Sequence, residues 1–256
     1  MSEGKSQNST KSDEKGASFS MDGMDFVEVN DEYINRMTSY EMDCNDGKGD
    51  PLACHNCGEF FSVIMDDKHK ARKIFETNCE VNNFSASCFN IAKLYFRGGR
   101  GGVKYDKEKA LGLFSKACKK GHIAACFHEG TIRHADASSK LKTEAMSSSL
   151  AKDLNLGLDL LVESCKGGIS DACYYAGTHW LKPDTAWRAP EKALPLLEIA
   201  CNERAHAPSC RNLQVMYLHG DGVGKDMDKA KHYFSRTMQL KKEQGLGDSL
   251  LGIKKA

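Results

Sequence analysis

The sequence predicts an all-α fold, an α-solenoid of helical hairpins in which disulfides join each hairpin to the next. Three observations predict it. Ten of the 11 cysteines form five close couples separated by long intervals. An apolar and a small residue stand 4 and 8 positions before the first cysteine of nearly every couple. The second cysteines recur every 34 to 47 residues, which is the range of stacked helical hairpins.

The N-terminal segment differs from the rest of the chain. Residues 1–24 are rich in Ser, Lys, Gly, Asn and Asp, with Phe19 as the only aromatic residue. Such a composition buries too little apolar surface to fold, so we expect a disordered polar tail that is neither a secretory signal nor an amphipathic transit peptide. Residues 25–256 are expected to form one solenoid, an N-terminal helix followed by five repeats at approximately 52–85, 86–123, 124–170, 171–207 and 208–242.

The charge of the chain is balanced, with 36 basic and 35 acidic residues. This balance is unlike the basic footprint of a nucleic-acid-binding protein or a polybasic membrane anchor. The chain also has no apolar run of about 18 residues, the length that a membrane span needs. We therefore expect a soluble protein with no nucleic-acid partner and no membrane span.

The second helix of each repeat leads to a cysteine in a regular register. Counting back from Cys118 by 4, 8 and 12 positions gives Phe114, Ala110 and Asp106. Offsets of 4 and 8 place the three side chains on one helical stripe, so the cysteine is expected to face inward. The fifth repeat keeps this spacing, with Met238 at the cysteine position. An aspartate at offset 12 is the expected N-cap of the helix, and the residues concerned are Asp67, Asp106 and Asp153.

The first helix of each repeat is expected to open at the second cysteine of a couple. In the third repeat, the Ser-rich residues 135–152 are interpreted as an inserted surface loop. In the fourth repeat, Pro195 falls inside the second helix, which is therefore expected to start late or to be kinked. The expected first helices run from Cys88 to Phe96, Cys126 to His134, Cys173 to Leu181 and Cys210 to His219.

The cysteine couples are expected to be disulfides between successive hairpins. The end of one second helix and the start of the next first helix meet across a tight turn, where Cα atoms come within bridging range. Closing a ring of about ten residues stabilises the fold by roughly 2 to 3 kcal/mol. The expected bridges are Cys44 to Cys54, Cys79 to Cys88, Cys118 to Cys126, Cys165 to Cys173, and Cys201 to Cys210, which leaves Cys57 free.

Two blocks of the chain resemble Sel1-like repeats, which are TPR-like helical hairpins. They run from residue 86 to 121 and from residue 208 to 234, and the first contains Leu94-Tyr95, Gly102-Val103, Asp106, Lys109-Ala110 and Lys116-Ala117-Cys118. The five couples, preceded by a short helix ending near Cys44, further resemble the Sel1-repeat assembly factors of cytochrome c oxidase. Bacterial cysteine-rich proteins of this repeat type form a looser match.

The resemblance implies a function and a location. It implies a monomeric scaffold of the mitochondrial intermembrane space that binds respiratory-chain subunits or other assembly factors of complex IV. Such a protein is imported without a cleaved presequence by the oxidative import machinery and is oxidised after entry, which reconciles disulfides with the absence of a signal peptide.

Two alternatives of another class remain open. Cys54 and Cys57 form a CxxC motif, so Cys57 is a candidate redox thiol of a thiol-disulfide reductase acting on copper-site cysteines. A haem-binding protein is the other alternative, with His or Met side chains as axial ligands, although the chain has no CxxCH motif and His122, His128 and His134 are interpreted as solvated or capping residues. A zinc site is not expected, because no second ligand pair stands at finger spacing.

Overall fold

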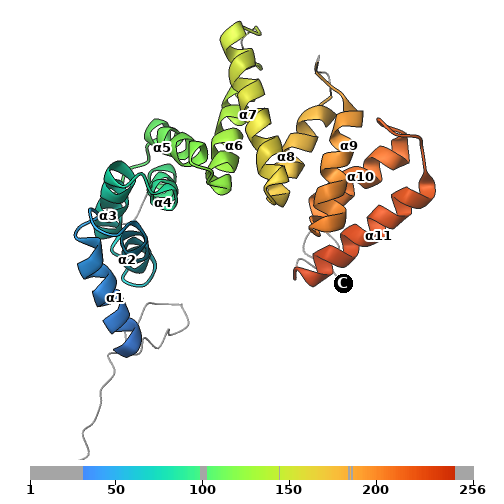
Figure 1. Cartoon of the computed structure of the whole chain (residues 1–256). Coiled ribbons are helices and arrows are strands. Elements are labelled where there is room, and N and C mark those ends of the chain that lie inside the picture. The colour runs from blue at the N-terminus through green and yellow to red at the C-terminus, as the bar shows by residue number, and fades with distance from the viewer. Residues whose placement is uncertain (1–30, 99–102, 144, 184, 186, 246–256) are drawn as a thin grey trace, which may run out of the picture. The chain divides into compact units, whose positions relative to one another are not determined.

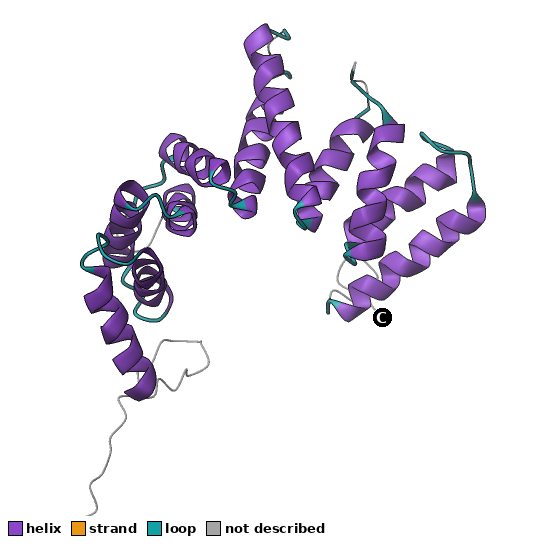
Figure 2. Ribbon diagram, in the orientation of Figure 1, coloured by secondary structure: helices purple, strands orange, loops and turns teal. Residues whose placement is uncertain are grey.

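The described part of the protein is built from helices joined by loops. The computed structural model describes residues 31–98, 103–143, 145–183, 185 and 187–245, and Figures 1 and 2 show no strand among them. The predicted all-α repeat class is confirmed, whereas the predicted tail at residues 1–24 lies outside the described residues. Within the described ranges, no helix has the length and apolar character that a membrane crossing requires.

The chain divides into two compact units, Met1–Asn82 and Asn83–Ala256. The described part of the first unit holds three helices, and α2 packs against both of the others. They are α1 (Asp31–Cys44), α2 (Pro51–Val63) and α3 (Lys68–Val81). The prediction that one solenoid runs from residue 25 to 256 stays a prediction.

The described part of the second unit holds four successive helical hairpins. Each helix packs mainly against its neighbours along the chain, as expected of a repeat protein. The hairpins are α4 (Ser85–Arg97) with α5 (Lys107–Lys119), α6 (Ile123–Lys140) with α7 (Ser148–Lys166), α8 (Ser170–Leu181) with α9 (Pro190–Glu198), and α10 (Ala207–His219) with α11 (Met227–Glu243).

The inward stripe of the second helices is where the register predicts it. Phe114, Leu161 and Leu197, each four positions before a cysteine, are all 0% exposed. Aspartates cap three of the second helices by accepting a backbone N–H three residues ahead. These are Asp67, Asp106 and Asp226.

The third repeat corrects two predictions. Asp153 is not an N-cap, because α7 already begins at Ser148 and the Ser147 hydroxyl accepts from the N–H of Leu150. The inserted loop at 135–152 is also wrong, since only residues 141–147 separate α6 from α7. The insertion instead lengthens both helices, and it does so because Leu150 and Leu154 bury their side chains against Ala137.

The first helices begin one turn earlier than predicted. In α4, α6, α8 and α10 the leading cysteine is the fourth helical residue rather than the first. The start of α6 and of α10 is capped by a histidine, since Nδ1 of His122 and of His206 accepts a backbone N–H. The capping role interpreted for His122 is confirmed, but because histidine is not among the usual capping residues the sequence pattern did not predict where these helices start.

The fourth repeat shows how Pro195 is accommodated. Helix α9 begins at Pro190, a position where proline is tolerated, so of the two predicted alternatives, a late start or a kink, the late start is wrong. Pro195 lies within α9, and a π-helical segment, Ile199–Glu203, follows directly. This segment carries Cys201 to the end of the hairpin.

Candidate functional site

Disulfides link the end of one hairpin to the start of the next. In the first unit Cys44 is joined to Cys54, with their Cα atoms 4.4 Å apart. In the second unit three bridges have Cα separations of 4.6 to 4.9 Å, and they join Cys118 to Cys126, Cys165 to Cys173 and Cys201 to Cys210. Cys79 and Cys88 are disulfide-bonded as well.

Two of the interhelical turns need a left-handed backbone. Gly121 and Gly168, which precede α6 and α8, have φ values of +83° and +104°. At the corresponding place before α10 stands Ala205, with φ +53°. A side chain makes this conformation unfavourable by roughly 1 to 2 kcal/mol, so the bridge between Cys201 and Cys210 closes a turn that costs free energy to form.

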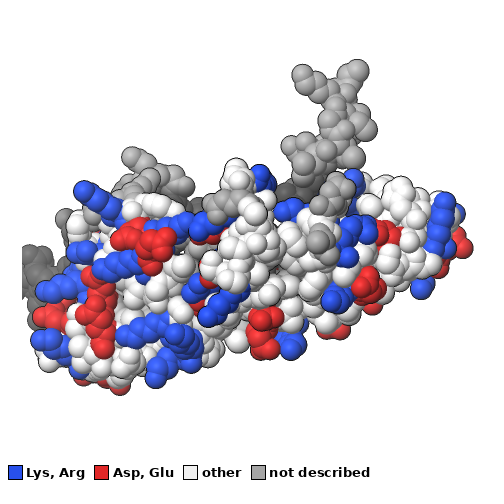
Figure 3. Space-filling model, turned by 90° about the horizontal axis from the view of Figure 1, so that it is seen from above, with Lys and Arg blue, Asp and Glu red and all other residues white. Residues whose placement is uncertain are grey.

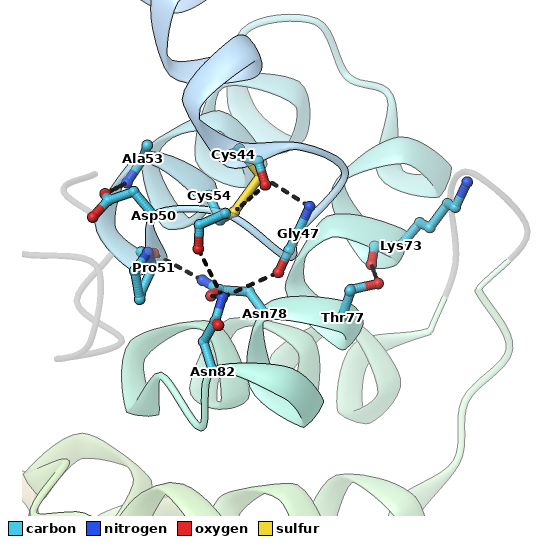
Figure 4. Close-up of a disulfide and its surroundings, with 11 residues drawn as sticks. Cys44, Gly47, Asp50, Pro51, Ala53, Cys54, Lys73, Thr77, Asn78 and Asn82 are labelled. Atoms are coloured by element: carbon cyan, nitrogen blue, oxygen red, sulfur yellow. Dashed lines mark hydrogen bonds between the residues drawn. A yellow bond between two sulfur atoms is a disulfide. The ribbon is translucent and has the colours of Figure 1, made fainter.

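Asn78 of α3 and Asn82, the C-cap residue of α3, hold the segment that the Cys44–Cys54 bridge closes (Figure 4). Asn78 is 0% exposed, and its amide donates to the carbonyl of Pro51 at 2.9 Å. The Asn82 amide donates to the carbonyls of Gly47 and Gly49, both at 3.2 Å. Asn82 therefore supplies a donor to two backbone oxygens of the loop between α1 and α2, and Asn78 ties α3 to the start of α2. The sequence analysis did not identify these asparagines, because no regular spacing in the sequence distinguishes an asparagine that hydrogen-bonds a distant loop.

Cys57, the candidate redox thiol, is the free cysteine of the described chain and lies in the interior of the first unit. It is 1% exposed, and burial, with Glu41 and Asp46 adding to the effect, raises its pKa to about 11. A reactive cysteine needs an accessible thiolate with a lowered pKa. The surroundings of Cys57 therefore oppose thiol-disulfide exchange at neutral pH.

Two histidines from different repeats face each other in the second unit. Nε2 of His134 on α6 lies 2.9 Å from Nδ1 of His179 on α8, so one nitrogen donates and the other accepts. The His179 ring also stacks on Trp187 at a centroid distance of 5.7 Å. Burial, together with His134 and Lys182, lowers the pKa of His179 to about 4, and burial lowers the pKa of His134 as well. The pair is therefore neutral at pH 7.

The histidines considered as haem ligands have other contacts in the structure. His122 caps α6 and stacks on Phe89 at 4.4 Å, and His128 stacks on Phe114 at 5.0 Å. His134 is bound to His179 as described. In the part of the chain that the structure describes, no three His, Cys, Asp or Glu side chains are grouped to hold a metal ion.

The surface offers open grooves of the size that partner side chains fill. In the first unit, a groove of about 380 Å³ between α1 and α2 is lined by Tyr33, Tyr40, Phe60 and Val63. In the second unit, a groove of about 660 Å³ lies along α5 and α6, over Gly112 and beside Lys119. Figure 3 shows basic and acidic side chains interspersed on the face in view, in keeping with the balanced charge.

The fold and its linked hairpins define a fold class, that of Sel1-like helical hairpins stapled by disulfides. The Sel1 repeat pattern matches residues 85–122 and 207–237, which contain α4 with α5 and α10 with most of α11. A Sel1 repeat protein from Oxalobacter formigenes superimposes with a TM-score of 0.61 at 18% identity, over 85% of this chain and 86% of that protein. A protective antigen of uropathogenic Escherichia coli with an SLR fold gives 0.64 at 16%, over 88% of this chain and 47% of that one.

Several relatives match most of the length of this chain, and all of them are named as the same assembly factor or its homolog. The chain is 29% identical to cytochrome c oxidase assembly factor 7A of Xenopus laevis, over 85% of this chain and 90% of the relative. It is 27% identical to cytochrome c oxidase assembly factor 7 of Homo sapiens, over 89% and 97%. The Drosophila melanogaster homolog of that factor is 25% identical over 87% and 92%.

Proposed function

We propose that this protein is an assembly factor for cytochrome c oxidase, respiratory complex IV, and that it acts by binding other proteins. The observation that carries the proposal is the match to relatives of that name along 85 to 89% of the chain. The match includes the repeats themselves rather than one shared motif. Its partners are respiratory-chain subunits or other assembly factors, and it works as a monomer.

The architecture supports a scaffold. Each hairpin contacts mainly its neighbours, so much of every helix surface stays available to a partner. Grooves of several hundred Å³ lie on both units. The histidine pair and the cysteine bridges sit inside the fold, where they stabilise it and do not meet a substrate.

We propose mitochondria as the location, and within them the intermembrane space. Disulfides persist in oxidising compartments and are rare where glutathione keeps thiols reduced. A chain with bridged cysteines at each of the three described turns between hairpins of the second unit fits such a compartment. Oxidative import machinery would close these bridges after entry.

A thiol-disulfide reductase is not the function that the geometry favours. The CxxC partner of Cys57 is already bridged to Cys44, and the raised pKa keeps Cys57 protonated. Cys57 is better explained as a small apolar side chain of the core, which is a common role for a free buried cysteine.

The experiment is deletion and complementation in cells of the source organism. Loss of the protein should lower assembled cytochrome c oxidase on native gels and its activity, while the other respiratory complexes keep their levels. The wild-type chain and a Cys57→Ser variant should both restore the oxidase, and protease protection in swollen mitochondria should place the chain between the membranes. Unchanged oxidase in the deleted cells would refute the function, and a chain protected after the outer membrane is opened would refute the location.

A further inference from the structure

The last repeat leaves open a helical stripe that the earlier repeats bury. The residue four positions before the second-helix cysteine is 0% exposed at Phe114, Leu161 and Leu197. The equivalent residue of α11, Phe234, is 48% exposed, and Met238 at the cysteine position is 37% exposed. Met227, seven positions and so about two helical turns before Phe234 on the same side, is 46% exposed. We call Met227, Phe234 and Met238 the α11 stripe.

What covers this position in the other repeats is the first helix of the next hairpin. The ring of His128 on α6 stacks on Phe114 of α5 at 5.0 Å. Leu161 of α7 packs with Ala172 and Cys173 of α8, and Leu197 of α9 packs with Ala207 and Cys210 of α10. The side of α11 that carries the stripe is therefore built to receive a helix.

The stripe also differs from the earlier repeats in chemistry. Each earlier position is tied to its covering helix by a disulfide, whereas Met238 replaces the cysteine and allows only noncovalent contact. Methionine is flexible and polarizable, and it is common on surfaces that bind a helix reversibly. A helix that occupies the stripe therefore binds reversibly.

The charges beside the stripe indicate which helix fits. Lys231 and Lys242 stand at helical spacing with Phe234 and Met238 and are exposed. Lys241 is the second basic residue of the last turn. The carboxylates nearby are those of Asp228, 3.5 Å from Lys231, and of Glu243. A helix with an apolar stripe and acidic residues along its edges matches this arrangement in both shape and charge.

We propose that the α11 stripe is the docking site for an amphipathic, acid-flanked helix of a partner protein, which completes the solenoid as the first helix of a next hairpin would. This inference rests on the proposed scaffold function and names the kind of partner segment that the scaffold takes. Apolar residues at positions i, i+4 and i+11 of a partner helix that runs antiparallel to α11 would match the spacing of Met238, Phe234 and Met227.

The test measures binding of a synthetic helical peptide to the full-length chain by fluorescence anisotropy. The probe carries leucines at i, i+4, i+7 and i+11 with glutamates at their flanks, and a second probe has lysines in place of the glutamates. We expect the glutamate probe to bind about tenfold or more tightly than the lysine probe, because the lysines of α11 repel the latter.

Variants of exposed residues separate binding from folding. The double variant Phe234→Asp, Met238→Asp should bind the glutamate probe about tenfold or more weakly than the wild type. The reason is that burying either new aspartate carboxylate in the interface costs free energy. Val215→Asp is the matched control, since Val215 is also exposed, at 42%, and lies on the neighbouring helix α10. It should bind as the wild type does, and circular dichroism should show that all variants are equally helical.

Several outcomes would overturn the proposal. They are equal binding by wild type and the Phe234 and Met238 variant, self-association that this variant abolishes, binding to phosphatidylserine vesicles in place of the peptide, and tighter peptide binding once residues 246–256 are deleted. The last three results would assign the stripe to a second copy, a lipid surface and the chain's own C-terminal segment. None of these measurements involves cytochrome c oxidase. If the docking proposal fails, the proposed assembly function is still tested independently by the deletion experiment.

Discussion

Acidification should destabilise the protein through the neutral histidine pair. His179 is 5% exposed, hydrogen-bonded to His134, and has its pKa lowered from 6.5 to about 4. As pH falls below 6.5 the unfolded chain takes up a proton that the folded chain excludes until about pH 4, so stability is present above pH 6.5 and is lost in that window. The full difference corresponds to about 3 kcal/mol, of which about 2 kcal/mol is lost by pH 5.

The assay is urea unfolding followed by circular dichroism at about pH 7.5 and about pH 5. The wild type should lose about 2 kcal/mol more than a His179→Gln variant between these values, because the variant has no proton to exclude at this position. Contributions of the carboxylates are common to both proteins and cancel in the comparison. A His219→Gln variant, altered at an exposed histidine of α10, should follow the wild type. Equal pH dependence of the wild type and His179→Gln would refute the reasoning.

Three further predictions concern the cysteines and the helix crossing. Cys57 should not react with a thiol reagent in the native protein at about pH 7.5, and it should react as a single thiol once urea unfolds the chain with its disulfides intact. Rapid labelling of the native protein would contradict the burial of Cys57. Replacing Cys165 and Cys173 by serine should lower the unfolding free energy by about 2 to 3 kcal/mol, and an unchanged denaturation midpoint would contradict the role of that bridge. Gly157→Ala should lower the unfolding free energy by about 1 to 3 kcal/mol in the same assay, because the added Cβ would lie 2.7 Å from the backbone N of His134. The control Gly112→Ala, which has open space at its Cβ, should not lower it.

The sequence predicted the helices best where a single residue type marks a position, such as the N-cap or the inward face of a helix. Asp67 and Asp106 are N-caps at their expected places, and the buried residue four positions before each cysteine was read correctly in every repeat that precedes another. Prediction failed where a different residue type does the same task. Ser147 displaced Asp153 as the cap of α7, and His122 began α6 a turn before Cys126.

The candidate site was less predictable than the fold. The CxxC spacing identified Cys57 but said nothing of its exposure, which the packing of α1, α2 and α3 decides. Nor did any offset relate Asn78 to the carbonyl of Pro51, 27 positions away. Met238 was recognised as the residue at the cysteine position, but its exposure became apparent only beside the buried equivalents of earlier repeats.

Repetition along the chain by itself determined the helical class, the hairpin period and the candidate cysteine couples, because helical periodicity and short ring closures are properties of neighbouring residues. Only the tertiary structure decided which side chains meet across hairpins. His134 and His179 are 45 positions apart in the sequence, and their ring nitrogens lie 2.9 Å apart only in the folded second unit. The low pKa of His179 arises first from burial, with His134 and Lys182 adding to it, and the burial of a side chain is a property of the folded protein that no stretch of sequence contains.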